Sequence, residues 1–204
     1  MALHELRKDG SIEILGLLTT VTKDYDRISM HGVRWTLLER QTEALGLPLE
    51  VVSISKDASN EEYDNAMRIA CEGFKKTGVS SIAFGDIFLE DVREYREKNL
   101  EQIGLTAIFP LWKKNTIMLS RNFLEFGFKA ITTCVDSKLL GKEFVGREYD
   151  EKFLSDLPSG IDPCGENGEF HTFVYDGPVL EKKVRFKKGE IVLRDGRFWF
   201  CDLI

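Results

Sequence analysis

The segment from Asp162 to Thr172 carries the densest group of reactive side chains in this chain. It reads Asp-Pro-Cys-Gly-Glu-Asn-Gly-Glu-Phe-His-Thr, which places three acids, a thiol and an imidazole within eleven residues. The two glycines permit backbone angles that are closed to other residues, so the segment is predicted to form a binding loop. Glu166, Glu169 and His171 are the predicted catalytic residues of this loop.

Three alternatives are open for the same loop. Cys164 and His171, with Asp162 and Glu166, could ligate zinc, and the Cys164 thiol could act as a nucleophile. Zinc sites usually show tighter and repeated ligand spacing, so no metal site is predicted. The structural alternative is a glycine turn whose acids accept hydrogen bonds from neighbouring backbone amides.

A second group of candidate residues lies around the end of an apolar strand. Gly85 and Asp86 follow that strand directly, and a carboxylate in this position can hold magnesium or a nucleotide hydroxyl. A solvated loop carboxylate is the alternative. Arg93, Arg96 and Arg147 are candidates for neutralising phosphate charge, because guanidinium groups match the geometry of phosphate. An exposed helix face is the simpler explanation for the first two.

The elements that must position these residues alternate between strands and helices. Ser59 begins a predicted helix as its cap, and Gly78 follows its end. Such alternation implies right-handed crossovers and an α/β fold, an open parallel sheet of the Rossmann-like, nucleotide-binding type. The predicted strands cover 12–20, 49–54, 80–84, 106–109 and 130–135, and the predicted helices cover 33–45, 59–76, 89–100 and 116–126.

Ligands of an open parallel sheet bind beyond the carboxyl ends of its strands. Segments 29–33, 85–90 and 134–136 all follow predicted strands, so we expect these three loops to converge on one cleft. The alternation weakens after residue 136, which predicts a domain at 1–138 for the nucleotide and a substrate subdomain at 139–204. Alternating apolar and polar residues from Val184 to Phe200, around Asp195 and Gly196, predict a C-terminal β-hairpin.

The composition fits a folded cytoplasmic protein. The chain has 204 residues, 43% of them hydrophobic, with a net charge of -6 and a pI near 5.3. This acidic balance argues against a nucleic-acid partner, and the basic residues at 182–188 are interpreted as a solvated strand face. The four cysteines show no paired spacing, and no signal peptide precedes them. No apolar stretch is long enough for a membrane helix, so no membrane partner is expected, and a homo-oligomer stays open.

Five motifs together carry a resemblance to a known family. The chain resembles the diphthine–ammonia ligases, also called the diphthamide-synthase domain family, which belong to the N-type ATP pyrophosphatases. The similarity runs in order from about Met1 to Pro178. The motifs are Ser29–Arg34, Ala83–Arg93, Phe109–Trp112, Gly146–Glu148 and Asp162–Thr172.

The resemblance implies an ATP-dependent, amide-forming reaction. A carboxylate attacks the α-phosphate of ATP, pyrophosphate leaves, and ammonia displaces AMP, with Mg²⁺ as the metal partner. His31, Gly32, Gly85 and Asp86 are then the expected nucleotide-binding residues. For His31, a hydrogen-bonding role at the start of a helix is the alternative. The carboxylate-bearing acceptor would be protein-bound diphthine or a small molecule.

One family feature is not found in this sequence. Family members open with a strand and a Ser-Gly-Gly-Lys-Asp-Ser loop, whose amides cradle the phosphates of ATP. Here Met1–Leu6 resembles the helix that follows that loop, so a late start codon or a shortened protein is expected. The competing function is a binding protein for a nucleotide or another small molecule, without ATP turnover.

The acidic loop also departs from the family pattern Glu-Gly-Gly-Glu-Phe-Glu. Asn167 replaces its second residue, and His171 replaces its final acid. Acids beside Phe170, Phe173 and Tyr175 would offer countercharge and aromatic faces to the cation of diphthine. An imidazole in place of an acid weakens that recognition, so the acceptor is expected to differ. Variants of this kind resemble a bacterial branch for which cobalamin salvage is a further alternative.

Overall fold

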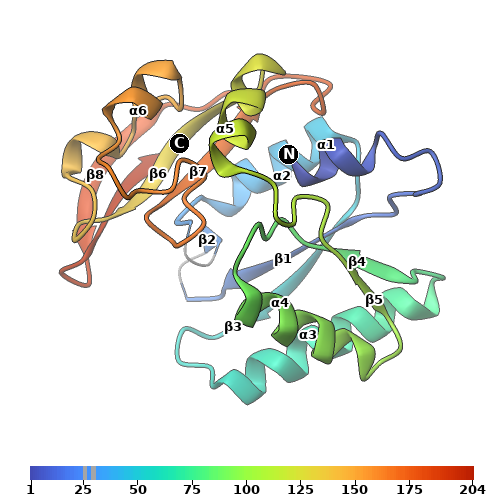
Figure 1. Ribbon diagram of the computed structural model, residues 1–204. Coiled ribbons are helices and arrows are strands. Elements are labelled where there is room, and N and C mark those ends of the chain that lie inside the picture. Colours follow the sequence, from blue (N-terminus) through green and yellow to red (C-terminus); the bar gives the residue numbers. More distant parts are fainter. Residues whose placement is uncertain (25–26, 29–30) are drawn as a thin grey trace. The chain divides into compact units, whose positions relative to one another are not determined.

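The computed structural model describes residues 1–24, 27–28 and 31–204. Helices and strands alternate along most of the chain (Figure 1). Contacts divide the chain into unit 1, residues 1–25 and 47–114, and unit 2, residues 26–46 and 115–204. The chain therefore crosses from one unit to the other three times, and the units divide it differently from the predicted boundary at residue 138.

Unit 1 contains two separate pairs of parallel strands. β1 (Leu17–Thr22) pairs with β3 (Leu49–Ile54), and β4 (Ser81–Ala83) pairs with β5 (Thr106–Ile108). Parallel strands joined through helices confirm the α/β, Rossmann-like class that the sequence predicts. A short helix, α1 (Ala2–Leu6), begins the unit.

The predicted strand at 12–20 is wrong for its first part, because β1 begins only at Leu17. The Leu17 N–H donates to the Pro48 carbonyl oxygen at 2.8 Å, next to the start of β3. Pro48 has no N–H to donate. The hydrogen-bonded pairing of β1 with β3 therefore does not extend back to residues 12–16.

Two helices cover the strands of unit 1. In α3 (Asn60–Lys76), the Ser59 side chain accepts from the Glu62 N–H, and the Glu62 carboxylate accepts from the Ser59 N–H, as in a capping box. α4 (Glu90–Glu101) packs on β5 and touches α3 (Figure 1). Together they close a small core around Cys71, Leu100 and Leu105.

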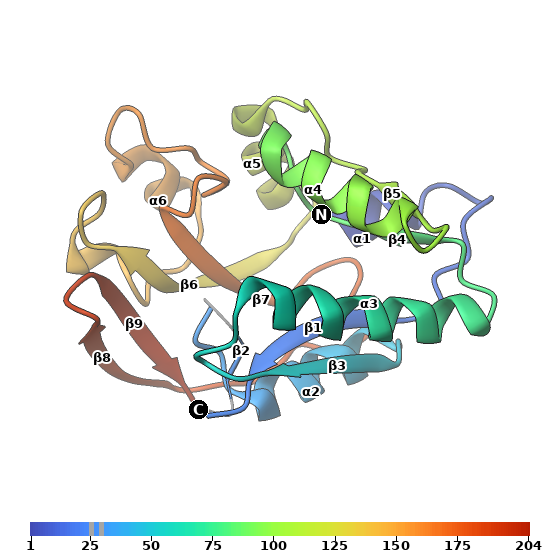
Figure 2. The same ribbon diagram turned by 90° about the horizontal axis from the view of Figure 1, so that it is seen from below.

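Unit 2 is built on a four-stranded antiparallel sheet in the order β7-β6-β9-β8 (Figure 2). The sequence prediction that the strand near 130–135 continues a parallel sheet is therefore wrong. The strands are β6 (Lys129–Asp136), β7 (Phe170–Asp176), β8 (Lys188–Arg194) and β9 (Phe198–Leu203). The predicted C-terminal hairpin is confirmed, with positive φ at Asp195 and Gly196 in its turn.

Helix α2 (Trp35–Leu45) belongs to unit 2 although it precedes most of unit 1 in sequence. Leu37 and Ala44 are buried in the same core cluster as Ile131 and Phe173. The Gln41 side chain donates to the Val174 carbonyl at 2.6 Å. The other elements of the unit are β2 (Arg27–Ile28), α5 (Thr116–Glu125), a 3-10 turn at Lys142–Phe144 and α6 (Glu151–Asp156).

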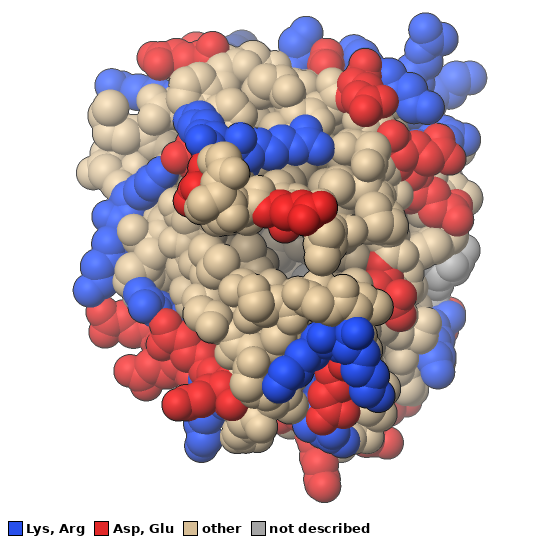
Figure 3. All heavy atoms as spheres, turned by 90° about the vertical axis from the view of Figure 1, so that its right-hand side faces the viewer, with Lys and Arg blue, Asp and Glu red and all other residues tan. Residues whose placement is uncertain are grey.

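Basic and acidic side chains are interspersed over the face drawn in Figure 3. Among the helices of the described residues, none is both long and apolar enough to cross a lipid bilayer.

Candidate functional site

The acidic loop of unit 2 is organised around the carboxylate of Glu169. This side chain is 2% exposed. Its Oε1 accepts from the Asp162 N–H at 3.0 Å and from Asn167 Nδ2 at 2.9 Å, and its Oε2 accepts from the Asn167 N–H at 3.0 Å. Glu169 therefore fixes the shape of the loop, as the structural alternative expects for this residue.

The glycines allow the loop to close on itself. Gly165 has φ +69°, and a Cβ on it would lie 2.7 Å from the Phe170 carbonyl oxygen, so other residues are excluded there. Asp162 Oδ2 accepts from the Glu166 N–H at 2.9 Å. The backbone of the half-buried Glu166 is thus fixed by Asp162, in the same loop as the buried Glu169.

The Cys164 thiol is poorly suited to nucleophilic chemistry. Burial, followed by the charges of Asp162 and Glu166, raises its pKa to about 12, so it stays protonated at neutral pH. Its sulfur donates to the Thr116 carbonyl oxygen at 3.4 Å. In the described part of the chain, no three His, Cys, Asp or Glu residues are grouped in a way that could hold a metal ion.

The two predicted site histidines, His31 and His171, are in contact. Their ring centroids lie 4.5 Å apart with the planes tilted by 43°. Burial lowers the pKa of both, and His31 also acts on His171, whose pKa falls to about 4. Both imidazoles are therefore neutral at physiological pH, and His31 also hydrogen-bonds the main chain of Thr172.

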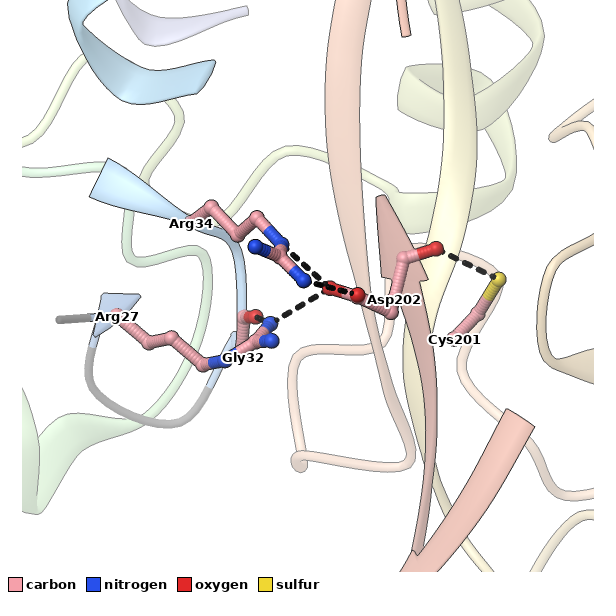
Figure 4. A network of polar contacts seen from close by, with 5 residues as sticks. All are labelled: Arg27, Gly32, Arg34, Cys201 and Asp202. Atoms are coloured by element: carbon pink, nitrogen blue, oxygen red, sulfur yellow. Dashed lines mark hydrogen bonds and ion pairs between the residues drawn. The ribbon is translucent and has the colours of Figure 1, made fainter. Parts of the chain in front are cut away.

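The segment that carries His31 is held against strand β9. Gly32 has φ +67°, and a Cβ there would come within 2.6 Å of the Phe200 ring. Asp202 binds the guanidinium groups of Arg27 and Arg34, as Figure 4 shows. The sequence prediction missed Arg27 and Asp202, and it gave Arg34 only as the end of a family motif, because a single acid in an alternating strand gives no signal of its distant partners.

The predicted aromatic faces for a cation are not available. Phe170, Phe173 and Tyr175 belong to the buried core of unit 2, and this part of the prediction is wrong. The Tyr175 hydroxyl donates to Glu148 Oε2 at 2.6 Å. Apolar side chains that alternate along β7 fill the core, and the sequence does not tell such aromatics from those of a binding site.

In unit 1, the Asp86 carboxylate faces Arg96. Arg96 Nε lies 3.0 Å from Asp86 Oδ2, and its guanidinium also stacks on the Phe84 ring at 4.3 Å. The ion pair is close but poorly aligned for a hydrogen bond between these two atoms. Gly85 is exposed, and nothing lies within 4 Å of a Cβ built on it, so its backbone is open to a ligand.

The other predicted phosphate-binding arginines have partners within their own units. Arg93 pairs with Glu97 at 2.7 Å, and its guanidinium lies over the rings of Phe109 and Trp112. In unit 2, Arg147 pairs with Asp156 at 2.8 Å. Each of these two guanidinium groups already binds a carboxylate, so neither is available solely for phosphate.

Phosphate commonly binds at the N-terminus of a helix, where backbone N–H groups point outward. Helix α3 starts with Glu61 and Glu62, and α4 starts with Glu90 and Asp91. These acids would repel a triphosphate, so the starts of α3 and α4 do not fit one.

A cavity of about 580 Å³ opens in unit 1 beside β4. Helices α3 and α4 line it with Met67, Cys71 and Leu100, and β4 contributes Ile82. Sequence reasoning missed this cavity, because apolar residues on a helix and a strand have the same sequence pattern whether they fill a core or line a cavity.

The three predicted cleft loops are divided between the units. Residues 31–33 and 134–136 lie in unit 2, and residues 85–90 lie in unit 1. Ser29 and Met30 fall outside the described residues. The convergence of all three loops on one cleft stays a prediction.

Comparison with known proteins identifies the family. The chain matches the diphthamide synthase N-terminal domain over residues 1–107 and the diphthamide synthase C-terminal domain over residues 115–202. It is 30% identical over 184 residues to a diphthine–ammonia ligase of Bos taurus, which covers 82% of this chain and 67% of that protein. Diphthine–ammonia ligases of Mus musculus and Homo sapiens are 27% and 26% identical, each over 83% of this chain and 67% of their own length. The chain belongs to the diphthamide synthase family.

Proposed function

We propose that this protein is an ATP-dependent, amide-forming ligase of the diphthine–ammonia ligase type. An acceptor carboxylate attacks the α-phosphate of ATP, pyrophosphate leaves, and ammonia then displaces AMP from the acyl adenylate to form the amide. The reaction class rests on the relatives, which are named diphthine–ammonia ligases. The location of the site rests on the contact between His31 and His171.

The proposed nucleotide-binding residues are His31 and Gly32 in unit 2 and Gly85 and Asp86 in unit 1. Mg²⁺ prefers carboxylate oxygens and usually binds through one or two carboxylates and the phosphates of its nucleotide. Asp86 is the carboxylate that follows β4, and it would hold the ion only after parting from Arg96. The starts of α3 and α4 offer acids to the phosphates, so we assign neither of these helix starts to the triphosphate.

The acceptor side, which we place within residues 139–204, uses the acidic loop. Glu166 supplies a carboxylate to a cationic acceptor, and Glu169 keeps the loop in shape. His171 is neutral, so an imidazole nitrogen can accept a hydrogen bond from the attacking ammonia and orient it, while its lowered pKa leaves the released proton to water. The acceptor is protein-bound diphthine or, given His171 and Asn167, a small carboxylate.

The acids at the starts of α3 and α4 favour a second candidate function. A chain that keeps the loops of the site but holds no triphosphate would act as a non-catalytic nucleotide or small-molecule binding protein. A cobalamin-salvage enzyme differs from the main proposal only in its acceptor, and acceptor screening separates the two.

The test is calorimetric binding of MgATP, with pyrophosphate release followed in parallel in the presence of protein-bound diphthine and ammonium. The ligase predicts release that depends on the acceptor, and loss of the ammonium-dependent step in the His171→Gln variant. Glu125→Gln, on the exposed part of α5, is the matched control. Binding of MgATP without any release, across a panel of carboxylates, would favour the binding protein.

A further inference from the structure

We infer that Asp202, on strand β9, is a positioning residue that holds His31 against His171. No motif of the sequence points to Asp202, which lies 171 positions after His31 in the chain. We call the contacts of Asp202 with Arg27 and Arg34, on either side of His31, the clamp. All of these residues lie within unit 2. The importance of the clamp for catalysis rests on the function proposed above.

Asp202 receives three hydrogen bonds from two arginines (Figure 4). Arg34 binds it in bidentate fashion, with Nε 3.0 Å from Oδ1 and Nη2 2.6 Å from Oδ2. Arg27 Nη1 lies 2.9 Å from Oδ1, and the same nitrogen donates to the Gly32 carbonyl oxygen at 2.6 Å. The carboxylate thus ties down both flanks of the segment that carries His31.

Ile28, Gly32 and Val33 are hydrogen-bonded to one another, and Gly32 packs against β9. The Ile28 N–H donates to the Val33 carbonyl at 2.9 Å, and the Gly32 N–H donates to the Ile28 carbonyl at 3.1 Å. Gly32 sits so close to the Phe200 ring that a Cβ would meet it at 2.6 Å. Because Gly32 is hydrogen-bonded to Ile28 and packed against Phe200, the backbone next to His31 has little freedom to move.

The sheet explains why a contact with β9 places His31 over β7. Residues that lie opposite each other in an antiparallel ladder share a face of the sheet. Cys134 of β6 lies opposite Phe200 on one side and opposite His171 on the other, so all three share one face. The His31 segment covers Phe200, and its imidazole reaches His171 in the same layer.

The charge balance makes the carboxylate essential to this arrangement. Two guanidinium groups share one acid, and the bidentate pair with Arg34 is of the strong, charge-assisted kind. The side chain of Asp202 is 19% exposed, so water only partly screens these bonds. Without the negative charge, Arg27 and Arg34 would repel each other, and the flanks of the segment would separate.

The test is histidine NMR on Asp202→Asn, which keeps the size of the side chain and removes its charge. The chain has three histidines, so each ring signal can be assigned with a single His→Gln variant. Burial, followed by the electrostatic effect of His31, holds the pKa of His171 at about 4, against an ordinary value of 6.5. We expect a rise of at least one unit in Asp202→Asn, and loss of the ring contact between His31 and His171.

The matched control is Asp156→Asn, which breaks the ion pair with Arg147 in the same unit. It should leave the titration of His171 unchanged. An unchanged titration in a folded Asp202→Asn protein would overturn the clamp. If that variant does not fold, Arg34→Gln removes the bidentate partner alone and must produce the same rise.

Activity separates the clamp from the proposed function. If the clamp and the function both hold, Asp202→Asn lowers kcat about tenfold or more while the KM for the acceptor changes little. A raised pKa of His171 with an unchanged kcat would support the clamp and would refute a catalytic role for the histidine pair.

Discussion

At the scale of single residues, the main role expected of Glu169 is to stabilise the acidic loop. Glu169→Gln replaces one acceptor oxygen by an NH₂ group that would face the N–H donors of Asp162 or Asn167. Leaving a buried donor without an acceptor costs about 1–3 kcal/mol, and the variant should lose that much unfolding free energy. Urea denaturation measures it.

Glu125→Gln is the control for that measurement, because Glu125 is exposed on α5. It should change the unfolding free energy by less than about 0.5 kcal/mol. Equal stability of Glu169→Gln and the unaltered protein would mean that the buried carboxylate does not order the loop.

The neutral histidine pair predicts a pH dependence of stability. The folded-state pKa of His171 is lowered to about 4, below its ordinary value of 6.5, so between these values the unfolded chain binds more protons. Unfolding free energy should therefore fall as the pH drops from 6.5 to 4, by roughly 2–3 kcal/mol from this residue. Below pH 4 both states are protonated, and its contribution no longer changes.

Chemical denaturation at pH 7.0 and pH 4.5 checks this dependence in the unaltered protein and in His171→Gln. The variant should lose less stability on acidification, although burial of His31 keeps part of the effect. The lowered pKa values of Asp136 and Asp202 add a loss only below their ordinary value of 3.8. The same acid-induced loss in both proteins would contradict the assignment to His171.

Residue types predicted the site only in part. The sequence identified Glu166, Glu169 and His171 as candidates, because such residues rarely gather in ordinary loops, and it identified His31 through the family resemblance of its segment. It did not separate the buried Glu169 from the half-buried Glu166, since burial depends on which segments cover the loop. Asp202 gave no signal, because its two arginine partners lie far away in the sequence.

At the scale of elements, the start of α3 was predictable from its own residues. Ser59 and Glu62 form a capping box that satisfies two backbone N–H groups. Ser59→Ala removes one acceptor and should lower the unfolding free energy by about 1 kcal/mol. Thermal and urea melts measure this change, with Ser55→Ala on the exposed end of the preceding turn as the control. A stability change no larger than that of the control would mean that α3 begins without help from its cap.

Strand β6 shows where local pattern stops being sufficient. Its residues from Ala130 to Asp136 are all buried, as in the central strand of a parallel sheet. Its neighbours are nevertheless β7 and β9, which pair with it in antiparallel directions. The apolar sequence of a strand predicts that both of its faces are buried. It does not predict the direction of the neighbouring strands, which depends on segments tens of residues away.

At the scale of the whole molecule, the order of segments along the chain differs from their grouping in space. The matched C-terminal domain begins at residue 115, but unit 2 also contains residues 26–46. No local pattern predicts this, because α2 has the same amphipathic character whichever sheet it covers. The acceptor side of the proposed site therefore depends on a helix that lies within the matched N-terminal domain.

This grouping predicts that residues 115–204 do not fold alone. They would lack Val33, Leu37 and Ala44, which are buried in the core of unit 2, together with the bond from Glu181 N–H to the Ala44 carbonyl. Burial of those three side chains contributes roughly 3–6 kcal/mol, a large part of the stability of an ordinary domain.

Residues 26–46 joined to 115–204 by a flexible linker should fold cooperatively. Near-UV circular dichroism, NMR dispersion and thermal melts compare the two fragments. In the joined fragment, Leu37→Asp should abolish the cooperative melt, because it buries a charge in that core. A cooperative melt of residues 115–204 alone would show that α2 is an accessory of unit 2 and not part of its core.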